Sequence, residues 1–304
     1  MTEITSYTAP ITPAQADVLK TILEAQGYVF REVPYARYGA QKGKLNITAY
    51  TSGKCLVQGR GTREFVEFVL EPQVLGVASL GYEFELNPEQ LDTRIGVDES
   101  GKGDFFGPLV IAAVYVNEEA VRFLQERGVR DSKKITSDKK IADLARAILD
   151  TPGVRAEVIP IMPETYNRLH VKMRSVNNIL GWGHARVIEN MLERMPLCKK
   201  AISDQFARTE YTVRKYLGER GRQIELIQRH KAESDFAVAA ASILAREGFV
   251  SRLQSLSREA GLTLPKGASP AVKAAARDLV ARFGEDRLDH FCKRHFKTRN
   301  ELDE

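Results

Sequence analysis

Apolar and polar positions along the first third of the chain predict a small unit of helices and strands. Residues 11–26 carry apolar side chains at helical spacing after a Thr-Pro start, which predicts a helix that ends at Gly27. Three runs rich in β-branched and aromatic residues then predict strands at 28–33, 44–50 and 54–59. With a hairpin turn over 51–53 and a second helix over 61–70, these elements form an α+β unit.

From residue 93 onward the pattern alternates between strands and helices. Strands are predicted at 93–98, 108–116, 154–159, 200–204 and 224–229. Helices are predicted at 119–127, 137–149, 163–173 and 177–194, followed by three more to about residue 297. This alternation predicts an α/β domain with a mixed sheet flanked by helices. The prolines and weak periodicity before it place a linker at 76–92, between domains at 1–75 and 93–304.

Charge and cysteine content narrow the class of protein. The formal net charge is +5 and the isoelectric point is about 9.0, which suits a phosphate-rich partner without requiring one. The three cysteines are far apart, with no Cys-Cys or Cys-His spacing typical of zinc, so we expect neither disulfides nor structural zinc. No signal-like or membrane-spanning stretch is visible. We therefore expect a cytoplasmic protein without membrane association.

The N-terminal strands carry an unusual charge pattern. Residues 33–63 contain six basic residues and no acid, interleaved with Tyr35, Tyr38 and Tyr50. Strands with cations and aromatic rings on an exposed face can lie along a sugar-phosphate backbone. A solvated sheet edge protected by lysines is the alternative, and the pattern alone leaves both open.

Acidic residues follow two apolar runs of the second domain. Asp98 and Glu99 come directly after the run ending at Val97, and Asp204 follows a similar run. If the two strands are neighbours in one sheet, these acids meet at its edge. A third acidic group, Glu233 and Asp235, precedes an alanine-rich helix, where Asp235 is also a plausible N-cap.

Such a set of carboxylates is typical of a two-metal site. Acids at the ends of several elements can hold two Mg²⁺ or Mn²⁺ ions roughly 3.5–4 Å apart, the geometry of in-line phosphodiester displacement. No protein nucleophile is then needed, and the sequence shows no Ser/His/Asp or Cys/His pattern. His184 and His230 have no local second ligand, so we interpret them as structural or surface groups.

Two basic loops accompany the acids. Gly101, Lys102 and Gly103 follow Glu99 closely, and glycine allows a nucleic-acid backbone to approach while the lysine supplies a cation. The spacing does not match the phosphate-binding loop of nucleotide hydrolases. The second loop, which contains Ser132 and Lys133, is by itself more typical of a solvent-exposed segment that leads into a helix than of a site.

Several motifs together resemble the type 2 ribonuclease H family, and within it the ribonuclease HIII group. They are GVDESGKGDFFGPLV, DSKK (131–134), YN (166–167), AISDQF (201–206), KAESDFAVAAASILAR (231–246) and LPKGAS (264–269). The resemblance covers 93–297 in order and implies a ribonuclease H-like fold, Mg²⁺ or Mn²⁺ dependence and endonucleolytic cutting of RNA in an RNA/DNA hybrid. It also implies that residues 1–75 resemble the TATA-box-binding protein and help to bind the hybrid.

Matched residue by residue, the resemblance implies that Asp98, Glu99 and Asp204 are metal-binding catalytic acids. It leaves Glu233 and Asp235 as alternatives for the fourth acid. The backbone of Gly101-Lys102-Gly103 resembles the reader of the RNA strand, with Ser132 and Lys133 as further contacts near the cut. Recognition through 2′-hydroxyl groups is expected to be nearly independent of sequence.

Two other functions compete with this hypothesis. One is cutting at single ribonucleotides in duplex DNA, as in ribonuclease HII; Lys102 where that group typically has arginine, and the N-terminal domain, favour the HIII group. The other is a non-catalytic nucleic-acid-binding module, which would have no reason to keep three carboxylates that repel phosphate. We expect a monomer with no identified protein partner.

Overall fold

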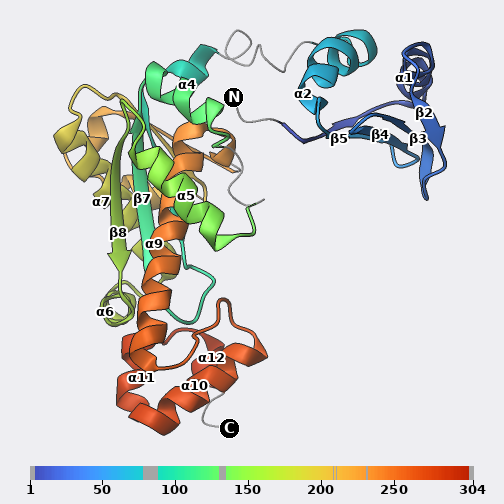
Figure 1. The fold of residues 1–304 in the computed structure, drawn as a ribbon. Helices are drawn as coiled ribbons and strands as arrows, with labels where there is room; N and C mark the ends of the chain where they lie inside the picture. The colour runs from blue at the N-terminus through green and yellow to red at the C-terminus, as the bar shows by residue number, and fades with distance from the viewer. Residues whose placement is uncertain are drawn as a thin grey trace. The chain divides into compact units, whose positions relative to one another are not determined.

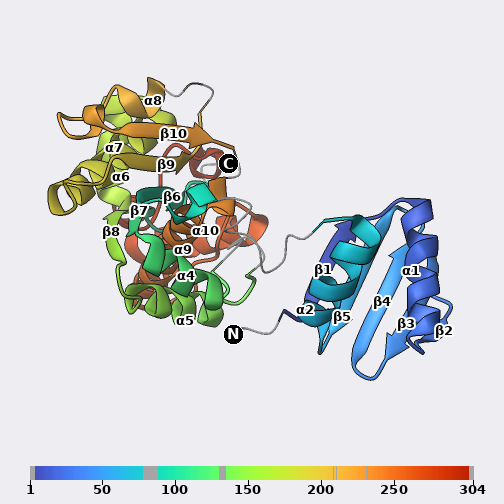
Figure 2. The same ribbon diagram turned by 90° about the horizontal axis from the view of Figure 1, so that it is seen from above.

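The structure is a computed structural model, and it describes residues 4–77, 88–129, 135–207, 209, 211–230 and 232–300, without the side chains of Glu233 and Asn300. The chain divides into two compact units, residues 1–89 and 90–304. Figures 1 and 2 show the elements of both units.

The N-terminal unit is an antiparallel sheet covered on one face by helices. Its elements are β1 (Ser6–Pro10), α1 (Pro13–Ala25), β2 (Val29–Arg31), β3 (Ala36–Lys42), β4 (Leu45–Tyr50), β5 (Lys54–Gly59), α2 (Thr62–Phe65) and η1 (Val66–Leu75). The sheet order is β1-β5-β4-β3-β2. Leu19 and Leu23 of α1 and Leu70 of η1 pack on the same buried cluster as Ile47 and Val57. The opposite sheet face carries mostly exposed side chains.

The short helix η2 (Pro88–Leu91) includes the boundary between the units in its sequence, and the C-terminal unit contains a mixed sheet. Its strands are β6 (Arg94–Ser100), β7 (Leu109–Val116), β8 (Arg155–Ile161), β9 (Lys200–Asp204) and β10 (Glu225–Arg229), in the order β10-β9-β6-β7-β8. Its helices are α4 (Glu118–Glu126), α5 (Asp138–Leu149), α6 (Pro163–Met173), α7 (Val176–Arg194), α8 (Tyr211–Arg214), η4 (Gly221–Gln223), η5 (Ala232–Ser234), α9 (Phe236–Ala260), α10 (Pro270–Phe283), α11 (Glu285–Phe291) and α12 (Lys297–Asn300).

Helices cover both faces of this sheet. Figure 2 shows the sheet between α7 on one side and α9, α4 and α5 on the other. Ile95 and Val97 of β6 face the α7 side, where they join a cluster with Ile179 and Ile188. Gly96, between them, faces α9, and a Cβ there would lie 2.1 Å from the backbone of Ala237. The close packing of α9 on β6 therefore depends on glycine and alanine.

The expected fold class is confirmed, with differences in detail. The sequence pattern did not predict β1 and β3, and four helices rather than three follow η5. Strand β3 escaped prediction because its buried stretch contains Gly39 and Ala40 between polar residues. Much of the expected linker, 76–92, lies outside the described residues, and the unit boundary falls between residues 89 and 90. None of the helices in the described ranges has both the length and the apolar composition of a membrane span.

Candidate active site

Three acids occupy adjacent ends of two parallel strands. Val97 of β6 pairs with Ser203 of β9, so Asp98 and Asp204, the next residues of each strand, lie side by side. Glu99 follows on β6. All three side chains are partly buried. The structure thus brings together acids from distant parts of the sequence because their strands are parallel neighbours.

Asp98 shows the electrostatic strain of this arrangement. Burial and the nearby charges of Glu99 and Asp204 raise the pKa of Asp98 to about 7, although hydrogen bonds from Ser242 of α9 and from the backbone amide of Glu99 lower it. The amide nitrogen of Glu99 lies 2.8 Å from Oδ1 of Asp98. Carboxylates crowded in this way favour a bound cation.

Glu99 is held between two basic side chains. Its Oε2 lies 3.1 Å from Nε2 of His184, and its Oε1 lies 4.0 Å from Nζ of Lys102. Lys102 also lies over the ring of Phe206, 5.6 Å from its centroid, and Phe206 packs edge-on against His184 at 4.8 Å. Lys102 is 40% exposed and keeps access to solvent.

The two alternatives for the fourth acid have different surroundings. The amide of Ala232 donates to Oδ1 of Asp204 at 3.1 Å, which places the start of η5, the short helix that includes Glu233, beside the acids. Asp235 is instead an N-cap: its Oδ1 accepts from the amides of Ala237 and Val238, and its Oδ2 accepts from Nε of Arg94 at 2.7 Å. Both oxygens of Asp235 are therefore engaged.

The glycine-lysine loop has one glycine required by packing and one left open. Gly101 has φ +89°, and a Cβ there would lie 2.2 Å from the carbonyl oxygen of Pro108. A Cβ at Gly103 would meet no atom within 4 Å. Gly101 therefore shapes the loop, whereas the space around Gly103 is free for another molecule.

The rest of this loop is anchored by segments distant in sequence. Lys293 is fully buried, and its Nζ donates to the carbonyl oxygens of Asp104 at 2.7 Å and Gly107 at 2.6 Å. Burial lowers the pKa of Lys293 to about 7, although Asp104 raises it. Gly267, from the LPKGAS motif, donates its amide to Oδ1 of Asp104 at 2.6 Å. Two segments near the C-terminus thus fix the loop.

Sequence reasoning missed His184. It lies in the middle of α7 with no exposed surface, and it contacts both Glu99 and Ser203. The available signal was a polar ring in GWGHAR, on the otherwise apolar buried side of the helix. The sequence-predicted contacts Ser132 and Lys133 lie outside the described residues.

The N-terminal sheet corrects the expected picture of its exposed face. Tyr38 is buried against α1, where its hydroxyl donates to the carbonyl oxygen of Ala16, so it does not lie on that face. Strand pairing aligns four uncharged polar residues across the exposed face, namely Ser6, Gln58, Asn46 and Gln41. Arg31 reaches this row with a 3.1 Å hydrogen bond to Asn46. We call these four residues the polar row.

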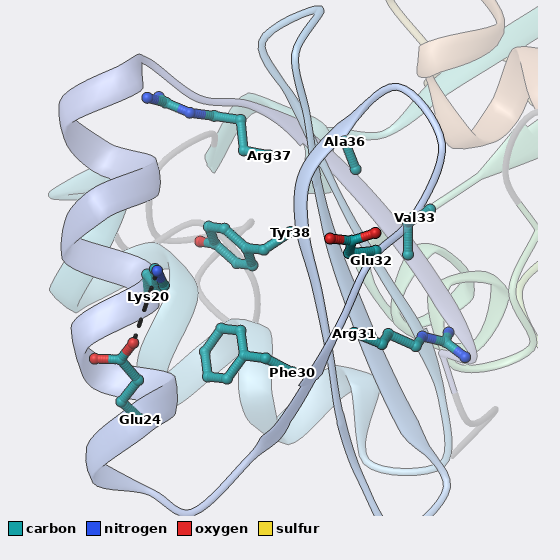
Figure 3. A pocket seen from close by; sticks show the side chains of 9 residues that line it. All are labelled: Lys20, Glu24, Phe30, Arg31, Glu32, Val33, Ala36, Arg37 and Tyr38. Carbon is teal, nitrogen blue, oxygen red and sulfur yellow. Dashed lines mark ion pairs between the residues drawn. The ribbon is translucent and has the colours of Figure 1, made fainter.

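The same unit contains a cavity of about 620 Å³ between α1 and the β2–β3 segment. Figure 3 shows Phe30 and Tyr38 pointing into it, with Lys20 and Glu24 of α1 at its side. Lys20 and Glu24 form an exposed ion pair at 3.9 Å. The cavity holds none of the sequence-predicted catalytic acids, although Arg37 and Tyr38 of the basic, tyrosine-containing stretch line it.

Asp98, Glu99 and Asp204 are the described carboxylates of this site that could hold a metal ion. Within the described part of the chain, no group of three or more His, Cys, Asp and Glu side chains has the arrangement of a metal site. The side chain of Glu233 lies outside that set. The donors of Asp98, Glu99 and Asp204 are carboxylate oxygens, which suit hard divalent cations. A cation would offset the burial and the neighbouring charges that raise the pKa of Asp98. The residues therefore fit Mg²⁺ or Mn²⁺.

Comparisons with known proteins find relatives along nearly the full length of the chain. The family model described as Ribonuclease HII matches residues 95–299, and a domain of unknown function, DUF3378, matches residues 12–74. Ribonuclease HIII of Protochlamydia amoebophila (strain UWE25) is 41% identical over 98% of this chain and 97% of that protein. Ribonuclease HIII of Chlamydia pneumoniae is 42% identical over 97% of each. The solved structure of Bst-RNase HIII in complex with Mn²⁺ has 29% identity and a TM-score of 0.68, covering 98% of both chains.

Proposed function

The chain belongs to the ribonuclease HIII family, and from this premise we propose that it hydrolyses the RNA strand of RNA/DNA hybrids as a metal-dependent endonuclease. The observation that carries the proposal is the convergence of Asp98, Glu99 and Asp204 beside the Gly101–Gly103 loop. The products are a 5′-phosphate and a 3′-hydroxyl, because water attacks phosphorus and the 3′ oxygen leaves.

Asp98, Glu99, Asp204 and Glu233 are the residues proposed to hold Mg²⁺ or Mn²⁺. When bound, the ions supply an activated water and stabilise charge on the leaving oxygen. Glu233 is preferred to Asp235 because both oxygens of Asp235 already accept hydrogen bonds. The related Bst-RNase HIII was solved as a Mn²⁺ complex, which supports the choice of ion.

The glycine-lysine loop is proposed to bind the RNA strand. The open space at Gly103 allows backbone groups to reach 2′-hydroxyls, which distinguish RNA from DNA without reading bases. Lys102 lies at 4.0 Å from Glu99 and remains 40% exposed, so it can also contact a phosphate. Anchoring of the loop by Lys293 keeps these groups in place.

The polar row is proposed to make the N-terminal unit a substrate-binding domain. Amide and hydroxyl groups can donate to phosphate and sugar oxygens and can accept from sugar hydroxyls, without a fixed charge. The row contains no acid that would repel phosphate. Binding there adds affinity but no chemistry, since the proposed catalytic acids belong to the other unit.

We also propose a cytoplasmic, monomeric protein. The three cysteines are free and buried, as suits a reducing compartment. All the acids proposed for catalysis come from a single chain, so a second copy is not needed to complete the site.

The test is a cleavage assay with Mg²⁺ or Mn²⁺ on two labelled substrates, a uniform RNA/DNA hybrid and a DNA duplex with one ribonucleotide. We expect the hybrid to be cut and the single ribonucleotide to be cut poorly. The variants Glu233→Gln and Asp235→Asn are assayed in parallel; loss of turnover is expected for Glu233→Gln, and residual turnover in the folded fraction for Asp235→Asn.

Each alternative has its own outcome. Preferential cutting at the single ribonucleotide would assign the chain the activity associated with ribonuclease HII. An absence of metal-dependent cutting of both substrates would instead support a non-catalytic nucleic-acid-binding module. Full turnover of Glu233→Gln, together with a folded but inactive Asp235→Asn, would make Asp235 and not Glu233 the fourth catalytic acid.

A further inference from the structure

His184 makes two polar contacts inside the α/β unit. It has no exposed surface, and its ring contacts one side chain on β6 and one on β9. Nε2 is 3.1 Å from Oε2 of Glu99, and Nδ1 is 2.9 Å from Oγ of Ser203. The ring therefore spans the two strands that carry the acids.

The identity of the partners determines which atom donates. An ionised carboxylate has only acceptor atoms, so Nε2 carries a hydrogen and donates it to Glu99. In the neutral ring Nδ1 is then an acceptor, and the Ser203 hydroxyl is its donor. The Ser203 hydroxyl has a single hydrogen, so donating it to Nδ1 excludes the alternative 3.1 Å hydrogen bond to the carbonyl oxygen of Asp204, the next residue. His184 thus orients Glu99 directly and contacts the neighbour of Asp204.

The packing around the ring keeps this orientation. Gly183 lets α7 approach the sheet closely, because a Cβ there would lie 2.0 Å from Cδ1 of Ile111. Phe206 packs edge-on against the ring at 4.8 Å. With Phe206 packed against its ring and both nitrogens bonded, His184 has little freedom to turn away from Glu99.

We propose that His184 is a positioning residue: by donating to Oε2 it fixes the Glu99 carboxylate in the orientation that binds the divalent cation. The inference rests on the proposed metal-dependent function of this site. Hydrogen-bond partners of metal-binding carboxylates orient them, and removing such a partner typically costs about 10- to 100-fold in metal affinity or activity.

Two conservative variants separate positioning from simple packing. His184→Gln keeps an amide donor near the position of Nε2 and thus the bond to Glu99. His184→Asn keeps polar atoms near Nδ1 and thus the bond to Ser203. We measure Mn²⁺ binding to the full chain by calorimetry without substrate, and kcat and KM on the hybrid at fixed Mn²⁺. Positioning predicts weakening of Mn²⁺ binding by about 10- to 100-fold in His184→Asn and recovery to within about threefold in His184→Gln.

A structural role predicts a different pattern. If His184 only links α7 to β9, His184→Asn binds Mn²⁺ normally and His184→Gln does not, and this outcome or equal binding by both variants overturns the proposal. Thermal unfolding without metal checks that both variants fold. If they do not, Ser203→Ala removes only the hydroxyl that supports the ring; weaker Mn²⁺ binding is expected, and unchanged binding counts against positioning.

A control variant and the cleavage assay distinguish failure of the positioning role from failure of the proposed function. His290→Gln alters another histidine between two carboxylates, Glu164 and Glu259, away from the site, and it should bind Mn²⁺ like the unaltered chain. Failure of the unaltered chain to cut either substrate would reject the proposed function. Normal cutting with metal affinity insensitive to His184 would reject only the positioning role.

Discussion

Acids beside the two ends of strand β6 lie in opposite electrostatic settings. At its start, Arg94 lies 2.7 Å from Asp235, and the two side chains are 1% and 4% exposed. At its end, Asp98 has two carboxylate neighbours, Glu99 and Asp204, and its pKa is raised to about 7 chiefly by burial and then by their charges. Strand β6 thus contacts one neutralised acid through Arg94 at its start and carries two of the three crowded acids at its end.

The difference teaches how to separate structural from functional acids in this fold. Asp235 has a buried cation and caps a helix, so its charge serves the folded state. Crowded carboxylates disfavour the folded state, and such an arrangement is typical of a site that binds a cation. The sequence presents Asp235 and Glu233 as equivalent candidates because both precede the same helix.

The largest expected effect is that of Asp98→Asn at the crowded end. Loss of one proposed metal-binding oxygen should lower kcat on the hybrid by at least about a thousandfold, equivalent to several kcal/mol. Without metal, the melting temperature should stay the same or rise, because one repelling charge is removed. Single-turnover cleavage and thermal unfolding measure the two effects; a strongly destabilised variant would contradict the comparison.

The opposite pattern is expected for Asp235→Asn at the paired end. Breaking a buried ion pair by removing one partner costs about 3–5 kcal/mol of the free energy of unfolding, because the other charge stays buried. Turnover per folded molecule should change far less than in Asp98→Asn. Chemical denaturation gives the stability.

A double-mutant cycle sharpens this prediction. Arg94→Met removes the cation, and the double variant with Asp235→Asn should be less destabilised than the sum of the single variants. Additive losses would show that Arg94 and Asp235 do not stabilise each other. Arg94 also donates to the carbonyl oxygens of Gln90 and Asp92, so some loss belongs to Arg94 alone.

A smaller effect is expected for the polar row of the N-terminal unit, which contains no acid. Asn46→Ala with Gln58→Ala removes two side chains of the polar row, and each lost hydrogen bond is worth about 0.5–1.5 kcal/mol. KM for the hybrid should rise by roughly tenfold while kcat stays unchanged, because the interaction does not involve the chemical step. Gln73→Ala, an exposed amide on η1, is the matched control. A fall in kcat with normal KM would argue against a purely binding role.

The smallest effect is expected for Glu164 and Glu259, two carboxylates that pair with His290, whose charge depends on pH. Burial lowers the pKa of His290, but hydrogen bonds to Glu164 and Glu259 outweigh it and raise that pKa above its ordinary value. The protonated ring therefore stabilises the fold fully below pH of about 6.5, and the contribution is lost as pH rises through the raised pKa. It should be small because His290 is 30% exposed.

Thermal unfolding across pH checks this last case. The melting temperature of the unaltered chain should exceed that of His290→Gln most at acidic pH, with the difference shrinking as pH rises. A difference that grows with pH would show that His290 is bound in its neutral form.

Local sequence pattern predicted most elements of the larger unit. Apolar runs ending in acid identified β6 and β9, because buried strands have a continuous apolar pattern that stops where the strand leaves the core. Strand β3 escaped because small residues carry a weak pattern signal.

By itself the sequence determined the fold class, the family and the set of candidate acids, since these depend on the order of residue types along the chain. Only the tertiary structure decided which acid is neutralised, because Arg94 and Asp235 are 141 residues apart. It also decided that His184, 85 residues from Glu99, contacts that acid. Both results follow from the packing of helices on the sheet, which brings together charges that no local pattern relates.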